Sequence, residues 1–335
     1  MSVSTPELRP GASLRATSIA AIAALAVLAF GLRIADPSRL PGLENFLLVF
    51  SSLLIEAVPF VLLGALVSAV IEVFVPVTAF ERLARLPKPL QLPLSGLAGI
   101  AFPVCECGSV PVARRLAAKG LSPAAAVTFM LAAPILNPIV IVSTVIAYRG
   151  RNELMPMVIG RVSLGFIAAI AVGWVVSGRA GDLLRVRPGE SVEEDHHHEH
   201  DGSRIASFFG HLAGDFTFMA KFLVFGAIAA AALQTFVPQS VIGGIAGTPV
   251  LDILALMALA FMLSLCSESD AFVAASFVQF GLGAQLAFLV FGPLIDTKLG
   301  FLYNATFSKG FLRTAILVVG AVTIAGTLWI EVLFG

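Results

Sequence analysis

A cysteine–glutamate–cysteine motif at residues 105–107 carries the most specific chemistry in the sequence. Thiolates prefer soft metals and metalloids, whereas carboxylates prefer hard cations. Two cysteines at this spacing can turn both sulfurs toward one point where a helix is broken, which a continuous helix does not allow. Cys266 lies one residue before the position that matches Cys105 in an internal repeat. The three thiols could therefore form a trigonal site for arsenite-like species. Alternatively, Cys266 is a small apolar core residue.

Glu106 and Glu268 lie 162 residues apart, and the same offset aligns the residues around them. Residues 105–108 (Cys-Glu-Cys-Gly) fall on residues 267–270 (Ser-Glu-Ser-Asp). The further matches in this ungapped register are Phe60, Gly64, Ala65 and Ala69 with Phe222, Gly226, Ala227 and Ala231, and Leu94, Leu97 and Ala98 with Leu256, Leu259 and Ala260. A repeat of this kind in a membrane chain points to a transporter whose site lies at the repeat interface.

The acids in the two copies could serve transport or structure. Either Glu106 or Glu268 could bind a proton in one conformation and release it in another, as proton-coupled transport requires. The alternative is a structural acid that accepts hydrogen bonds from the amides at the start of the following helix. Asp270 adds a third acid, and its equivalent is Gly108, so the two copies differ in chemistry.

The repeat resumes after a gap of three residues, where Pro134–Asn137 matches Pro293–Asp296. Prolines within a span free backbone carbonyls, and Asn137 and Asp296 would place polar groups beside each break. These two side chains either face the site or only pack helices together. Lys298 could neutralise Asp296, Glu268 or Asp270. The candidate substrate-binding residues are Cys105, Glu106, Cys107, Cys266, Ser267, Glu268, Ser269, Asp270, Asn137, Asp296 and Lys298, and the candidate break residues are Pro103, Gly108, Pro111, Pro134 and Pro293.

The composition places most of the chain in lipid, because 58% of the 335 residues are hydrophobic and only 13% are charged. Apolar runs long enough to cross the hydrocarbon layer occur at 16–35, 44–75, 122–148, 154–177, 208–236, 284–306 and 311–334. We expect the first run to be a retained anchor and not a signal peptide, because no convincing cleavage site precedes the charged stretch from Arg33 to Arg39. No basic stripe indicates nucleic-acid binding, and no Walker motif, zincin motif or nucleophile–base pair indicates an enzyme.

Residues 92–119 and their repeat counterpart 250–281 are apolar but interrupted, so each is either a kinked span or a re-entrant hairpin. Kinked spans would place nine Lys and Arg residues on each side, whereas hairpins place fourteen on the cytoplasmic side and four outside. The positive-inside rule therefore favours hairpins and a cytoplasmic N-terminus. With three spans and one hairpin between equivalent points, the repeats are inverted, and the hairpin tips can meet.

We therefore predict an all-α polytopic membrane protein with about seven to nine membrane segments and two inverted repeats, each with a broken or re-entrant helical hairpin. The expected divisions are an N-terminal anchor helix at 1–43, repeat 1 at 44–177, a cytoplasmic linker at 178–207, repeat 2 at 208–310 and a C-terminal membrane helix at 311–335. The linker contains the run EEDHHHEHD, in which His196, His197, His198 and His200 could capture a divalent metal. Alternatively, the run is an ordinary hydrophilic linker.

The segment from Phe102 to Asn137, FPVCECGSVPVARRLAAKGLSPAAAVTFMLAAPILN, resembles the core of the predicted bacterial permeases related to ArsP-type organoarsenical efflux permeases. The Ser-Glu-Ser-Asp-Ala-Phe stretch from Ser267 and the Gly-Pro-Leu-Ile-Asp stretch ending at Asp296 fit the same family, over residues 44–310. The resemblance implies a multi-pass permease of the bacterial inner membrane that exports a thiol-seeking metalloid or its organic derivatives.

The expected partners are membrane lipid and a small metalloid or metal substrate. We expect no nucleic-acid partner. The chain could also form a homo-oligomer. We expect no cofactor, with proton coupling as an option for the acids. The alternative function is a divalent-cation transporter that uses the acid pairs and the His-rich loop.

Overall fold

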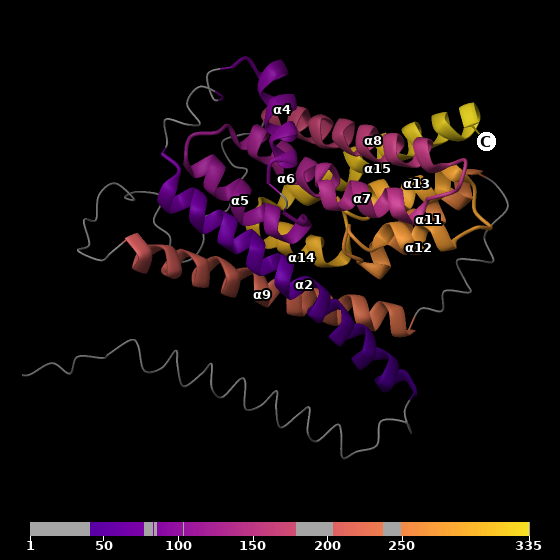
Figure 1. Cartoon of the computed structure of the whole chain (residues 1–335), viewed down its shortest axis with the longest axis horizontal. Coiled ribbons are helices and arrows are strands. Elements are labelled where there is room, and N and C mark those ends of the chain that lie inside the picture. Colours follow the sequence, from indigo (N-terminus) through magenta and orange to yellow (C-terminus); the bar gives the residue numbers. More distant parts are fainter. Residues whose placement is uncertain are drawn as a thin grey trace, which may run out of the picture. The chain divides into compact units, whose positions relative to one another are not determined.

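The computed structural model describes residues 41–76, 83, 86–102, 104–178, 204–236 and 249–334, and the regular elements in these ranges are helices (Figure 1). They are α2 (Pro41–Phe74), α4 (Lys88–Leu97), η2 (Ala98–Ile100), α5 (Glu106–Ala118), α6 (Pro123–Leu136), α7 (Pro138–Ala147), α8 (Leu154–Val176), α9 (Arg204–Phe236), α11 (Pro249–Leu263), α12 (Asp270–Ser276), α13 (Leu282–Phe291), α14 (Thr297–Thr306) and α15 (Lys309–Phe334). The chain divides into two compact units, Met1–Leu48 and Val49–Gly335, and the packing described below is that of the second unit.

Five helical stretches are long and apolar enough to cross a membrane: Gly42–Phe74, Pro123–Ala147, Leu154–Val176, Arg204–Phe236 and Gly310–Val332. They coincide with five of the predicted spans, so the chain is an all-helical, multi-pass membrane protein. The predicted span 16–35 lies outside the described residues, as does nearly all of the linker at 178–207. The predicted span 284–306 is instead two short helices, α13 and α14, because the chain unwinds around Pro293.

Helix boundaries and contacts recur between the two copies. The spans 42–74 and 204–236 each have 33 residues and lie at the 162-residue offset. α4 packs on α6 as α11 packs on α13, α6 packs on α8 as α13 packs on α15, and α8 and α15 pack side by side (Figure 1). In addition, α5 contacts α14 and α12 contacts α7. Each copy's broken segment therefore packs against a helix of the other copy.

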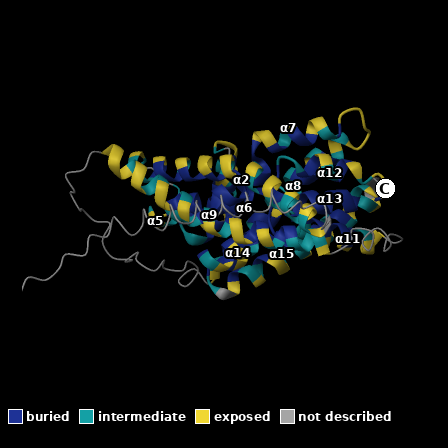
Figure 2. Ribbon diagram, turned by 90° about the horizontal axis from the view of Figure 1, so that it is seen from below, coloured by how far each residue is buried: buried dark blue, intermediate teal, exposed yellow. Residues whose placement is uncertain are grey.

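Burial separates central helices from lipid-facing ones. Ala124–Leu136 of α6 and Gly283–Phe291 of α13 are buried without interruption. In contrast, α2 and α9 expose large apolar side chains such as Ile55 and Phe225, and Figure 2 shows this difference between α6 and α2. Exposed apolar surface of this extent is stable only in contact with lipid or another apolar partner. The buried central helices carry the polar site into the protein interior.

Candidate functional site

The first hairpin unwinds between Ile100 and Glu106, where η2 ends and α5 begins. Cys105 is the N-cap of α5, because its backbone is extended and its sulfur accepts a hydrogen bond from the Gly108 amide at 3.4 Å. The predicted break is too wide, since Gly108 and Pro111 both lie within α5. α5 begins directly after Cys105, which caps it, so neither Gly108 nor Pro111 interrupts the helix. Pro103 lies outside the described residues.

The second hairpin unwinds between Leu263 and Asp270, where α11 ends and α12 begins. Ser264 has a φ of +49°, a left-handed conformation that is uncommon for a residue other than glycine. Its hydroxyl accepts hydrogen bonds from the Thr297 amide at 3.0 Å and the Lys298 amide at 3.4 Å. The unusual turn thus satisfies amides at the start of α14, which have no partner within their own helix.

The two hairpin tips, residues 104–108 and 264–270, are in direct contact. The Ser267 hydroxyl donates a 2.8 Å hydrogen bond to Oε2 of Glu106, and both residues are buried. The contact joins residues that are 161 positions apart in the chain. It brings together the motifs that the sequence singled out in each copy.

Lys298 links the first tip to the helix break of the second copy. Its Nζ lies 3.9 Å from Oε1 of Glu106 and 3.8 Å from Oδ2 of Asp296, and all three side chains are buried. The partners are thus Asp296, which was expected, and Glu106, which was not.

Arg161 of α8 belongs to the site, although the sequence interpretation did not include it. Its side chain is 1% exposed and donates to Oδ2 of Asp270 at 2.8 Å, to the Ser267 carbonyl at 3.0 Å and to the Thr144 hydroxyl at 2.9 Å. The sequence alone could have identified Arg161, because a basic residue inside an apolar span is rare and pairs with a polar group when it is buried. Lys221, the comparable residue in α9, is exposed.

Asn137 and Asp296 have equivalent structural roles. Oδ1 of Asn137 accepts a hydrogen bond from the Ile139 amide at 3.0 Å, and Oδ1 of Asp296 accepts one from the Leu299 amide at 2.6 Å. Each residue therefore caps the helix that follows it. Asp296 also faces Lys298, so it belongs to the charged cluster as well. Of the associated prolines, Pro134 lies within α6 and Pro293 lies in the unwound segment.

The buried centre has an excess of acids. The buried Glu106, Asp270 and Asp296 and the partly buried Glu268 face two bases, so these six groups carry a net charge of −2 if every group is ionised. The bases are Arg161 and Lys298. Because uncompensated charge is costly away from water, protons or a cationic species must balance the excess.

The three thiols are buried and free. Cys105, Cys107 and Cys266 form no disulfide. Within the described ranges, no three His, Cys, Asp or Glu side chains could hold a metal ion. The three-thiol site stays a prediction, and the four histidines at 196–200 lie outside the described residues. Ser269 donates to the Cys266 carbonyl at 3.1 Å, within its own tip.

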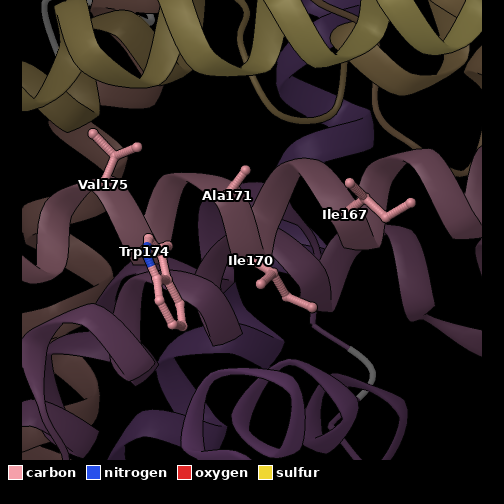
Figure 3. Close-up of a pocket in the computed structure, with 5 residues that line it drawn as sticks. All are labelled: Ile167, Ile170, Ala171, Trp174 and Val175. Carbon is pink, nitrogen blue, oxygen red and sulfur yellow. The ribbon is translucent and has the colours of Figure 1, made fainter. Parts of the chain in front are cut away.

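A shallow depression on α8 is a separate feature. Ile167, Ile170, Ala171, Trp174 and Val175 line it, and all five belong to this one helix (Figure 3). The hollow contains none of the acids, thiols or bases of the hairpin tips. Its apolar lining suits a lipid chain, so we place the candidate site at the tips.

Comparisons with known proteins agree with this architecture. A family profile described as "Predicted permease" (ArsP_1) matches residues 42–332. The chain is 39% identical over 287 residues to the UPF0718 protein YcgR of Bacillus subtilis (strain 168), covering 84% of this chain and 96% of the relative. It is 31% identical over 268 residues to the "Putative two-component membrane permease complex subunit" of Streptococcus mutans serotype c, covering 79% and 88%. No solved structure matches the chain significantly. The family description and the name of the Streptococcus mutans relative both refer to permeases, which are transporters.

Proposed function

The chain belongs to the ArsP_1 family of predicted permeases, and from this premise we propose that it exports a small thiol-seeking metalloid, such as a trivalent arsenic species or an organic derivative. The observation that supports the proposal is the hydrogen bond from Ser267 to Glu106, which joins the two tips, because Cys105 and Cys107 flank Glu106 in the first tip. The first tip thus combines soft sulfur with a titratable carboxylate, and irregular backbone inside a membrane protein is tolerated only where it is buried or lines a cavity.

The proposed mechanism is alternating access around inverted repeats. The paired contacts support it, since each hairpin packs on the other copy's helix, α5 on α14 and α12 on α7. Rocking of one copy against the other would expose the tips first to one face and then to the opposite face. Membership of the permease family supports a location in the bacterial inner membrane, and the distribution of Lys and Arg supports a cytoplasmic N-terminus.

A divalent-cation permease is the second candidate. The excess of two negative charges among the buried acids and bases favours it, because a divalent cation would balance that charge. In this alternative, the His-rich run at 193–201 would collect metal on the cytoplasmic side.

Transport into inside-out vesicles tests the proposal, with arsenite and methylarsenite as metalloid probes and zinc as the cation probe. Cys105→Ser and Cys107→Ser replace soft sulfur with hard oxygen, so metalloid transport should fall at least about tenfold, equivalent to ~1.4 kcal/mol. Ser109→Ala in α5 is the matched control, because its hydroxyl bonds only to the Glu106 carbonyl of its own helix. Full metalloid transport by both serine variants would remove the thiols from the mechanism. Zinc transport without metalloid transport would establish the second candidate.

A further inference from the structure

Three of the four acids at the hairpin tips and the α14 break are buried and have partners. Glu106 accepts a hydrogen bond from Ser267 and faces Lys298, and Asp270 is held by Arg161. Asp296 caps α14 and also faces Lys298. Each of these acids therefore has a cation or a hydrogen-bond donor that stabilises its negative charge.

Glu268 differs from the other three acids. Both of its carboxylate oxygens are inaccessible to solvent and have no hydrogen-bond partner among the described residues. Within the same ranges, no Lys, Arg or His forms an ion pair with it. The residue as a whole is only partly buried, and the charged groups that act on it are Glu106, Asp270 and Glu56 of α2, all of them acids. An ionised carboxylate covered in this way is strongly disfavoured, whereas a protonated one is tolerated.

A proton explains this arrangement better than a bound metal ion. A metal needs several ligands, and no group of three His, Cys, Asp or Glu side chains in the described part of the chain could supply them. A proton needs only one carboxylate. The repeat equivalent, Glu106, cannot serve in the same way, because Ser267 and Lys298 already compensate its charge.

We infer that Glu268 is the carboxyl that takes up and releases the coupling proton, whereas Ser267, Lys298 and Arg161 hold the other three acids, Glu106, Asp270 and Asp296. The inference rests on the proposed transport function and assigns its coupling step to one residue. The proton comes from water on one side of the membrane and returns to water on the other. Partial exposure of Glu268 allows that exchange when the second hairpin moves.

Infrared spectroscopy of the purified full chain in lipid nanodiscs tests the protonation state without any substrate. The wild type should show a protonated carboxylic-acid band that disappears as the pH rises. Glu268→Gln should lack this band, whereas Glu106→Gln should keep it, and Asp270→Asn serves the same purpose if Glu106→Gln does not fold. A band that persists in Glu268→Gln would overturn the inference. So would the absence of a band at every pH, or a band that appears only after a chelator removes metal.

Transport in proteoliposomes tests the coupling step, with arsenite and methylarsenite as probes. Glu268→Gln should still exchange probe between equal concentrations but should lose accumulation driven by a proton gradient. Accumulation equal to that of the wild type would refute the role of Glu268. If the wild type moves neither probe, the proposed cargo is wrong, and the infrared result still decides whether Glu268 carries the proton.

Discussion

The Ser267 hydroxyl donates a 2.8 Å hydrogen bond to the Glu106 carboxylate and thereby joins the two broken hairpins. In the repeat alignment, Ser267 corresponds to Cys105, which caps the helix that Glu106 begins. Cys105 and Ser267 occupy equivalent positions, and both act on the start of α5. Cys105 caps the helix, and Ser267 donates to the carboxylate of Glu106. The two copies meet at this point, but their chemistry is not symmetric.

Removing this hydroxyl should destabilise the contact between the tips. Ser267→Ala leaves a buried carboxylate oxygen of Glu106 without its donor, so we expect a loss of about 1–3 kcal/mol in the free energy of unfolding. Denaturant unfolding in detergent measures it. Ser269→Ala is the control, because its hydroxyl bonds only within its own tip. Equal stability of both variants would show that the contact between the tips contributes nothing.

Breaking the pair between Arg161 and Asp270 should have a larger effect. Arg161→Gln leaves Asp270 as an uncompensated buried charge, so we expect a loss of about 3–5 kcal/mol. Arg161→Gln combined with Asp270→Asn should recover part of that loss, because it removes both charges. A double-mutant cycle on the unfolding free energies measures the coupling. Additive losses would contradict a direct interaction between the two side chains.

The close approach of α2 and α5 should tolerate no side chain. A Cβ at Gly64 would lie 2.3 Å from the Cα of Gly108, and backbone cannot yield as a flexible side chain can. Gly64→Ala should therefore cost about 1–3 kcal/mol or prevent folding, visible in the melting temperature and the yield of folded protein. Gly210→Ala in α9, where the added Cβ meets nothing within 4 Å, should leave both unchanged. Normal stability of Gly64→Ala would mean that the helices can separate freely.

The proposed topology predicts the accessibility of single engineered cysteines in a cysteine-free background. Position 117, near the end of α5, should react with an impermeant reagent only after the cells are permeabilised. Position 152, which is exposed just before α8, should react in intact cells and serves as the control. Labelling of position 117 from outside would rule out the inverted arrangement.

Deletion of residues 193–201 tests the His-rich run as a metal trap. The variant should change the zinc sensitivity of transport while the folded membrane core persists, because the run is not part of the predicted spans. Transport assayed across a range of zinc concentrations measures this effect. An unchanged response at every concentration would make the run an ordinary linker.

Local sequence signals predicted much of the architecture. Long apolar runs located five spans, since a helix must be about 20 residues long to cross the hydrocarbon layer. Proline, glycine and polar residues located the helix breaks near Cys105, Asn137 and Ser267. The predicted width of the first break was less accurate, because Gly108 and Pro111 lie within α5, the helix that Cys105 caps.

By itself, therefore, the sequence determined the membrane class, the duplicated motifs and the residues that carry chemistry. Only the tertiary structure decided how these residues pair: Arg161 with Asp270, Ser267 with Glu106, and Lys298 between Glu106 and Asp296. It also left Glu268 without a partner in the described part of the chain. Helix periodicity and composition are local properties, whereas a pair such as Arg161 and Asp270 forms only when packing brings distant helices face to face.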